Sequence, residues 1–179
     1  MTDQERAELL QRLDSAVSLL VRAISPELIP ETGSNIVYAL KGARDSDDVA
    51  AVGGRIRRQA GRPYTAGAVS FGADKDVARI VLTTMRFDPA IRSVATIRYD
   101  PGTIRICEDL FFEICHFDRN QEPPGIRTME WGVASCCREG IPDVIYDRGA
   151  AGKEAMIRIL GDNPLAVANN IIKVSARMM

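Results

Sequence analysis

The sequence has very little histidine and no membrane-length apolar run, and both absences narrow the possible function classes. His116 is the only histidine among the 179 residues, so a zinc site built from several histidines is excluded. No apolar run approaches the roughly 18 residues that a transmembrane helix needs. The first residues, MTDQERAELL, are charged and amphipathic rather than typical of an export signal. We therefore expect a cytoplasmic protein with no membrane partner.

The sequence also lacks metal-type cysteine spacing and a strong net charge. No CxxC pair occurs among its four cysteines, which we expect to be buried, reduced thiols: Cys107, Cys115, Cys136 and Cys137. The formal net charge is −1, which argues against broad electrostatic binding to nucleic acid. A length of 179 residues, of which 46% are hydrophobic, fits one globular domain over residues 1–179.

Apolar periodicity and cap residues predict alternating helices and strands. An N-terminal amphipathic helix over residues 1–25 begins with a capping box at Thr2 and Glu5. Further helices are expected in a short segment before Val52, at Val77–Arg86, after the cap Asp100, at Thr128–Glu139, and from the cap Asn163 to Ala176. Strands are expected at Ile36–Leu40, Arg55–Gln59, Ala66–Phe71, Ser93–Tyr99, Glu113–Phe117, Asp143–Tyr146 and Met156–Leu160. This alternation favours an α/β fold with helices on both faces of a sheet.

Two charged loops follow the strands expected at Glu113–Phe117 and Asp143–Tyr146. If these strands run parallel, both loops leave the same edge of the sheet, where ligands tend to bind. Arg119, Arg148 and Lys153 would then converge on one anion. Alternatively, each acid in these loops pairs with a neighbouring base on a solvated surface. The second loop is not a Walker nucleotide-binding loop, because its glycines are too close together and Glu154 replaces the required hydroxyl.

Nine short blocks follow one another along the chain: Gly33–Ile36 with Tyr38–Leu40, Gly54–Ile56, Phe71–Ala73 with Val77–Ile80, Phe87–Pro89, Ile97–Tyr99, Phe117–Arg119, Thr128–Gly132, Pro142–Tyr146 and Gly152–Glu154. In this order they resemble the archaeal-type thiamine-phosphate synthase family, ThiN, a domain also found fused behind a hydroxymethylpyrimidine kinase. The resemblance extends from the region of Leu13 to that of Lys173. It implies a three-layer α/β/α fold with a mixed, mostly antiparallel sheet, similar to the class II (AraD-like) aldolase fold.

The resemblance also implies an activity, the joining of hydroxymethylpyrimidine diphosphate to thiazole phosphate with release of pyrophosphate. Such a transferase must neutralise the charge of the leaving group and hold two substrates in line. The implied partners are these phosphorylated pyrimidine and thiazole compounds and thiamine phosphate. The diphosphate implies Mg²⁺ as a cofactor, with Asp143 or Asp147 as its ligand.

The matched blocks supply the candidate site residues. The resemblance implies catalysis by an arginine and a histidine together, and the catalytic candidates are Arg119, His116, Asp118 and Glu130. Glu130 or Asp118 would bind the amino group of the pyrimidine. The candidates for binding substrate or phosphate are Gly33, Ser34, Asn35, Arg55, Gly72, Ala73, Asp147, Gly149, Gly152 and Lys153, together with Arg79, and of these Arg55 and Arg79 are the weaker ones.

Two candidates near the start of one helix have a structural alternative. Glu130 lies in the first turn of its expected helix, where an acid interacts favourably with the helix dipole whether or not it binds a ligand. Trp131 either stacks on a heteroaromatic ring of the substrate or packs in the core.

A second function class stays open, a non-catalytic module that senses thiamine phosphate with the same domain. Regulators of that kind place a helix-turn-helix in front of the domain, whereas only one helix is expected before Gly33. The enzyme is therefore favoured. The apolar stripe of the first helix packs on its own domain or against a second subunit, so a homo-oligomer is a hypothesis.

Overall fold

The computed structural model describes residues 2–121, 123 and 128–178 of the protein. Seven strands form one sheet in the order β5-β2-β1-β6-β9-β8-β7. Their bounds are β1 Ile36–Ala39, β2 Val49–Val52, β5 Val69–Phe71, β6 Ser93–Arg98, β7 Ile114–His116, β8 Val144–Asp147 and β9 Met156–Gly161. Neighbouring strands are antiparallel except β7 and β8, which are parallel, so the predicted mixed, mostly antiparallel sheet is confirmed.

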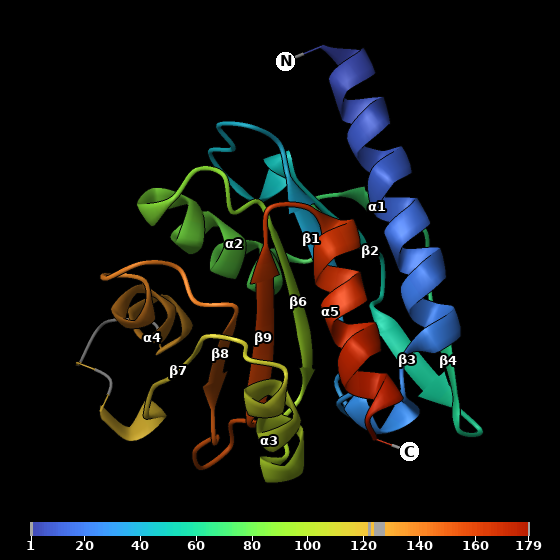
Figure 1. The fold of residues 1–179 in the computed structure, drawn as a ribbon. Coiled ribbons are helices and arrows are strands. Elements are labelled where there is room, and N and C mark those ends of the chain that lie inside the picture. The colour runs from blue at the N-terminus through green and yellow to red at the C-terminus, as the bar shows by residue number, and fades with distance from the viewer. Residues whose placement is uncertain (1, 122, 124–127, 179) are drawn as a thin grey trace.

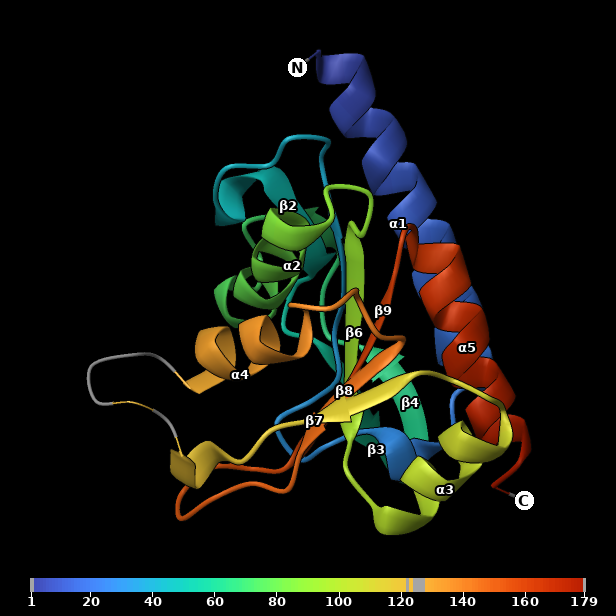
Figure 2. The ribbon, with the colours of Figure 1, turned by 60° about the vertical axis from the view of Figure 1, so that its left-hand side comes forward.

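Helices cover both faces of the sheet, as predicted for a three-layer α/β/α fold (Figure 1). They are α1 Asp3–Ala23, α2 Lys75–Phe87, α3 Pro101–Asp109, α4 Thr128–Cys136 and α5 Pro164–Ala176, with short 3₁₀ helices η1 Pro26–Leu28, η2 Ser46–Asp48 and η3 Arg119–Gln121. Figure 2 shows α1 and α5 side by side on one face and α2 and α4 on the other. The hairpin of β3 Ile56–Gln59 and β4 Arg62–Thr65 forms a separate two-stranded sheet.

The predicted caps set the helix boundaries. Thr2 and Glu5 form the capping box of α1, and the side chains of Asp74, Asp100 and Asn163 accept backbone hydrogen bonds at the starts of α2, α3 and α5. The apolar stripe of α1, from Leu9 to Leu20, is buried in the core beneath α1 and α5. The second core lies beneath α2 and α4. Because strand side chains alternate, Ile159 enters the first core and Leu160 the second.

Two segments differ from the sequence prediction. Residues 49–52 form strand β2 rather than a short helix, because an apolar run of four residues is too short for its periodicity to separate the two structures. Residues 62–65 form β4, although Pro63 predicts a turn. Among the described strands β4 pairs with β3 alone, so it is an edge strand, where a proline is tolerated.

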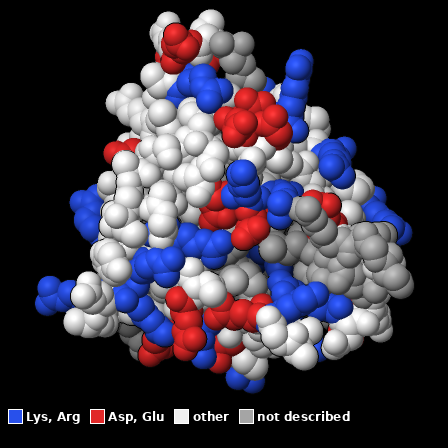
Figure 3. All heavy atoms as spheres, turned by 180° about the vertical axis from the view of Figure 1, so that it is seen from behind, with Lys and Arg blue, Asp and Glu red and all other residues white. Residues whose placement is uncertain are grey.

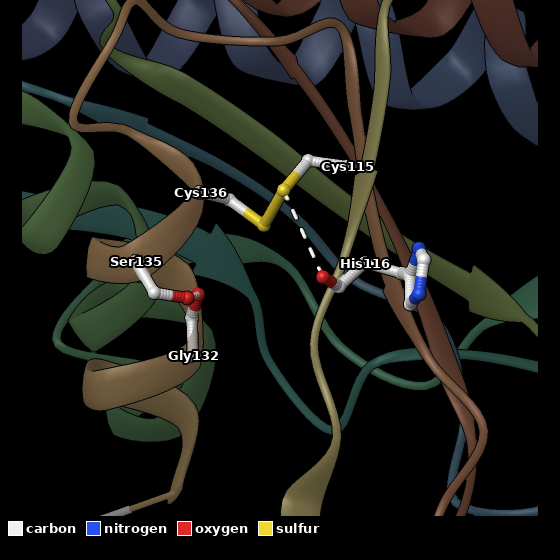
Figure 4. The surroundings of a disulfide bond; sticks show 5 residues. All are labelled: Cys115, His116, Gly132, Ser135 and Cys136. Atoms are coloured by element: carbon white, nitrogen blue, oxygen red, sulfur yellow. Dashed lines mark hydrogen bonds between the residues drawn. A yellow bond between two sulfur atoms is a disulfide. The ribbon is translucent and has the colours of Figure 1, made fainter.

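The cysteine prediction is half wrong. Cys107 and Cys137 are buried free thiols, as expected, but Cys115 on β7 and Cys136 on α4 form a disulfide (Figure 4). Their Cα atoms are 5.8 Å apart, which is within the usual range for a disulfide. This proximity arises because β7 and α4 pack together across 21 residues of chain. The disulfide therefore ties the outermost strand of the sheet to the helix that covers it.

Candidate active site

Most of the predicted site residues lie along one edge of the sheet, the edge formed by the ends of its strands. β7 and β8 are parallel, so both end at this edge, and β9, antiparallel to β8, begins there. β6 then ends there and β1 begins there, because each neighbouring pair is antiparallel. A hydrogen bond of 2.8 Å from the Thr32 hydroxyl to a Glu154 carboxylate oxygen joins the segment before β1 to the loop before β9. The prediction that the two charged loops leave one edge is thus confirmed.

A cavity of about 610 Å³ opens at this edge between α4 and the ends of β7 and β8. It is lined by His116, Phe117, Asp118, Asn120, Gln121, Trp131, Ser135, Arg148 and Gly149. Three predicted site residues, His116, Asp118 and Gly149, therefore line the same cavity, together with Arg148 and Trp131. The cavity is large enough for a drug-sized ligand, for which pockets of roughly 300–1,000 Å³ are usual.

Phe117 and α4 form the apolar side of this cavity. The Phe117 ring is buried and packs edge-on against Trp131, with ring centroids 6.4 Å apart. A side chain at Gly132 would overlap the Phe117 ring, so only glycine lets α4 approach β7 this closely. Trp131 is half-buried, contacts the core and lines the cavity, which is compatible with both of its predicted roles.

Asp147 lies behind the cavity in a buried cluster with two arginines. Its side chain has no solvent exposure, and its Oδ2 accepts a 2.9 Å hydrogen bond from the equally buried Arg158. Its Oδ1 lies 3.0 Å from Nε of Arg119 and accepts a hydrogen bond from the amide of Gly149. Burial lowers the pKa of Arg158, and the nearby charge of Arg119 lowers it further, while Asp147 opposes both effects. One carboxylate thus holds two guanidinium groups and the start of the charged loop.

On the other face of β8, three rings lie in a row. The Tyr146 ring stacks on Tyr99 at a centroid distance of 5.5 Å and on His116 at 5.3 Å. The His116 ring therefore lies on the face of the sheet opposite Phe117, as strand alternation predicts, and Figure 4 shows it pointing away from the disulfide. The guanidinium of Arg148 lies over the Tyr146 ring, 5.9 Å from its centroid.

A second polar cluster surrounds the start of β1, and its charges compensate one another. Nε of Arg55 lies 3.0 Å from the buried carboxylate of Asp74, which also accepts a hydrogen bond from the Asn35 side chain. Asp76 lies 3.7 Å from the same guanidinium. Arg79 in turn pairs with Asp76 at 3.4 Å. Arg55 and Arg79 are thus engaged by carboxylates, and neither of them is among the residues that line the cavity.

The backbone donors predicted at 33–35 are occupied. The amides of Gly33, Ser34 and Asn35 donate to Pro30, Ile56 and Thr96. The hydroxyl of Ser34 is buried without a hydrogen-bond partner among the described residues. Of these three residues, only Ser34 has a side-chain polar group without a partner among the described residues, and that group is buried.

The predicted phosphate-binding role of Gly72 and Ala73 has no geometric support. The Gly72 amide donates to Val49, at the opposite end of β2 from the cavity edge, and Ala73 packs against the core beneath α2. A side chain at Gly72 would contact a carboxylate oxygen of Asp47, so a negative group already occupies the space beside it.

The predicted magnesium ligands do not lie together. Asp143 precedes β8 and Asp147 ends it, so they occupy opposite ends of one strand, about 13 Å apart at the usual rise per residue. Asp143 accepts a hydrogen bond from the Glu113 amide, and Asp147 is held by two arginines. Across residues 2–121, 123 and 128–178 no group of three potential metal ligands occurs. These two carboxylates therefore cannot bind one Mg²⁺ together.

Lys153, Gly152 and Glu130 lie near the site without lining the cavity. Ala150 and Lys153 close a tight turn through two backbone hydrogen bonds, with Gly152 exposed in that turn. Glu130 is half-buried in the first turn of α4. That Arg119 and Lys153 bind one anion together stays a prediction. Arg148 lines the cavity, and Arg119 pairs with Asp147 at the end of β8.

Sequence reasoning missed Arg158, Tyr146 and Tyr99. Arg158 stands inside the apolar run Met156–Leu160, and a charged residue at an inward-facing strand position was a usable signal, because buried arginines are rare unless paired. The tyrosines gave no such signal, since their stacking depends on the order of β6, β9 and β8 in the sheet.

The molecular surface mixes charges of both signs. Figure 3 shows basic side chains next to acidic ones over the face opposite to the view of Figure 1. In the part of the chain that the structure describes, no helix is long and apolar enough to span a membrane.

Comparisons with known proteins agree with this architecture. The family model of thiamine-phosphate synthase ThiN matches residues 12–173. The chain is 40% identical over 154 residues to the thiamine-phosphate synthase ThiN of Methanothermobacter thermautotrophicus, covering 82% of this chain and 81% of that protein. It is 41% identical over 169 residues to the bifunctional thiamine biosynthesis protein ThiDN of Methanocaldococcus jannaschii, covering 93% of this chain but only 40% of that longer protein.

Solved structures show the same fold. The C-terminal domain of a phosphomethylpyrimidine kinase superposes with a TM-score of 0.90 at 36% identity, covering 95% of this chain and all of that domain. An L-fuculose-1-phosphate aldolase from Thermus thermophilus superposes with a TM-score of 0.53 at 14% identity, covering 97% of this chain and 94% of the aldolase. The aldolase likeness concerns the fold alone and confirms the predicted aldolase-like arrangement. With the family model matching nearly the whole chain, the protein belongs to the thiamine-phosphate synthase ThiN family.

Proposed function

We propose that this protein joins hydroxymethylpyrimidine diphosphate to thiazole phosphate in the cavity between α4 and the ends of β7 and β8. Membership of the ThiN family supports thiamine-phosphate synthesis as the activity. The observation that carries the proposal for the site is the cavity itself, because it presents His116, Asp118 and Arg148 together beside the Arg119–Asp147 pair.

The reaction forms one bond and breaks one. The thiazole nitrogen donates its lone pair to the methylene carbon of the pyrimidine, and the bond from that carbon to the diphosphate oxygen breaks. The electron pair of the broken bond leaves with pyrophosphate, and the nitrogen becomes the cationic centre of the thiazolium product. The site must therefore stabilise growing negative charge on the leaving group.

Arginines are suited to this task because a guanidinium can donate two parallel hydrogen bonds to phosphate oxygens. Arg148 lines the cavity, and Arg119 lies behind it with a side chain that is 10% exposed. In our proposal Arg148 binds the diphosphate directly, and Arg119, oriented by Asp147, supports it. Asp118 is the carboxylate among the cavity-lining residues and would accept a hydrogen bond from the amino group of the pyrimidine.

Mg²⁺ remains a prediction, as a counterion that enters with the diphosphate. Magnesium is often held by one carboxylate together with substrate phosphates. Asp118 is an alternative ligand to the pair Asp143 and Asp147, because it is exposed at the cavity; as a Mg²⁺ ligand it would act in place of its role toward the pyrimidine amino group. Turnover measured with and without added Mg²⁺ tests this assignment.

The proposal is tested by incubating the purified protein with both substrates and Mg²⁺ and measuring thiamine phosphate by chromatography. Arg148→Ala and Arg119→Ala should each lower kcat/KM by on the order of 100-fold, as expected when a donor to developing charge is lost. Arg105→Ala removes an exposed arginine of α3 outside the cavity lining and should leave turnover unchanged.

Two results would contradict the proposal. Equal loss in Arg105→Ala would show that the effect does not come from the cavity. Tight binding of thiamine phosphate without any turnover by the unaltered protein would instead identify a thiamine-phosphate sensor.

A further inference from the structure

Tyr146 connects two cavity-lining residues that belong to different strands. Its ring is 7% exposed, and it stacks on the exposed imidazole of His116 at a centroid distance of 5.3 Å with 25° between the ring planes. The guanidinium of Arg148 lies 5.9 Å from the centroid of the same ring. One buried ring therefore contacts the side chains of two residues that belong to the cavity lining, from the face of the sheet opposite Phe117.

Tyr99 supports this arrangement from the other side. It follows β6 and stacks on Tyr146 with 19° between the ring planes and 5.5 Å between their centroids. The neighbouring side chain of Tyr99 raises the pKa of Arg148, and Tyr146 acts in the same direction. Arg148 therefore lies over the Tyr146 ring, although its side chain is exposed.

Exposed side chains normally sample several rotamers, and ordering them during binding costs free energy. A ring fixed in the core removes part of that cost, because a stacked imidazole and a guanidinium over an aromatic face are held before the ligand arrives. The contacts of Tyr146 supply both kinds of restraint at once.

We propose that Tyr146 is a positioning residue that fixes His116 and Arg148 for a substrate carrying a flat heteroaromatic ring beside an anionic group. His116 offers its free face to the ring, and Arg148 binds the phosphate of the same molecule. The inference rests on the proposed function, since it assigns the pyrimidine diphosphate to the strand ends on the Tyr146 side of the sheet, next to the cavity. Tyr146 itself is not among the residues that line the cavity.

Because His116 is the only histidine, its orientation can be observed directly in the whole protein. NMR spectra of protein labelled in histidine give one set of imidazole signals, and these signals carry the ring-current shift of a stacked tyrosine. In Tyr146→Leu the shift should disappear, whereas Tyr146→Phe keeps the ring and should retain it. KM for the pyrimidine diphosphate should rise by on the order of tenfold in Tyr146→Leu, and kcat should fall less.

Tyr38→Leu is the matched control. Tyr38 is also buried at 3% exposure, also carries an arginine over its ring, Arg92 at 4.8 Å, and lies at the far end of β1 from the cavity edge. It should alter stability without moving the His116 signals. If Tyr146→Leu does not fold, Tyr99→Leu replaces it, because Tyr99 is only half-buried and its loss should shift the same signals less.

The proposal is overturned if the His116 signals are the same in Tyr146→Leu and the unaltered protein, or if Tyr38→Leu raises KM equally. Failure of the proposed function would look different, because the unaltered protein would then make no thiamine phosphate. In that case the affinity for thiamine phosphate, measured by calorimetry, takes the place of KM. Equal affinity in Tyr146→Leu and the unaltered protein would again reject the positioning role.

Discussion

Replacement of Asp147 should strongly destabilise the fold. Its carboxylate is fully buried between Arg119 and Arg158, so Asp147→Asn would leave two guanidinium groups without their counter-charge. Removing one partner of a buried ion pair typically costs about 3–5 kcal/mol. We expect a loss of that size in the free energy of unfolding, measured by urea denaturation.

Asp143→Asn provides the comparison for that measurement. Asp143 lies directly before the same strand and accepts one hydrogen bond from a backbone amide, so its replacement should cost only about 1 kcal/mol. Equal losses in the two variants would show that the Asp147 cluster does not stabilise the fold in the way described.

The free thiols at Cys107 and Cys137 should be unreactive in the folded protein. Burial raises the pKa of each from 9.0 to about 11, so the thiolate is scarce at pH 8. Below pH 9 both the folded and unfolded thiols are protonated and stability is unaffected. As the pH rises from 9 to 11, the unfolded thiols lose protons before the folded ones, so the free energy of unfolding falls.

Alkylation followed by mass spectrometry checks this prediction. At pH 8 the folded chain should take up label slowly, and the chain unfolded without a reductant should take up two labels. Four labels under non-reducing conditions would mean that Cys115 and Cys136 are not joined.

At the scale of elements, the disulfide should stabilise the packing of α4 on β7. The bond closes a loop with a sequence separation of 21, for which chain entropy predicts about 3 kcal/mol. Cys115→Ser should therefore unfold at a lower urea concentration than the oxidised protein, and addition of a dithiol reductant should remove the difference. Cys107→Ala, which leaves the disulfide intact, should respond to the reductant as the unaltered protein does.

The elements that sequence predicts well are those with local signals. Thr2, Asp74, Asp100 and Asn163 cap their helices because a side-chain oxygen satisfies an amide of its own first turn. The sequence predicts a helix where β2 forms, because nothing within Val49–Val52 distinguishes the two structures and only pairing with β1 and β5 decides between them. The Cys115–Cys136 pair likewise depends on tertiary packing that local patterns do not contain.

Sequence predicts those site residues that lie at or directly after the ends of strands. The parallel pair β7 and β8 brought His116, Asp118, Arg148 and Gly149 to one cavity, as the loop positions indicated. Sequence proximity to a motif was a weaker guide. Gly72 and Asp143 lie within matched blocks, yet each lies at the end of its strand away from the cavity edge.

At the scale of the whole molecule, the stripe of α1 gives no reason to expect a second subunit. Leu13, Val17 and Leu20 are buried against this chain's own core, with α5 alongside. We therefore expect light scattering to give a mass near 19.6 kDa. A mass twice as large would require an interface elsewhere on the surface, and truncation of the exposed first turns of α1 would then leave the dimer intact.

The order of strands also has a consequence for synthesis. The pairing of β6 with β9 divides the sheet into two parts. One part comes from the first part of the chain and contains β5, β2, β1 and β6; the other comes from the last part and contains β9, β8 and β7. While the ribosome still holds the later strands, β6 presents a row of unpaired amides and carbonyls between Ser93 and Arg98, which later pair with β9. Such an open edge recruits foreign strands. Nascent chains arrested before Met156 should therefore be the form most dependent on chaperones.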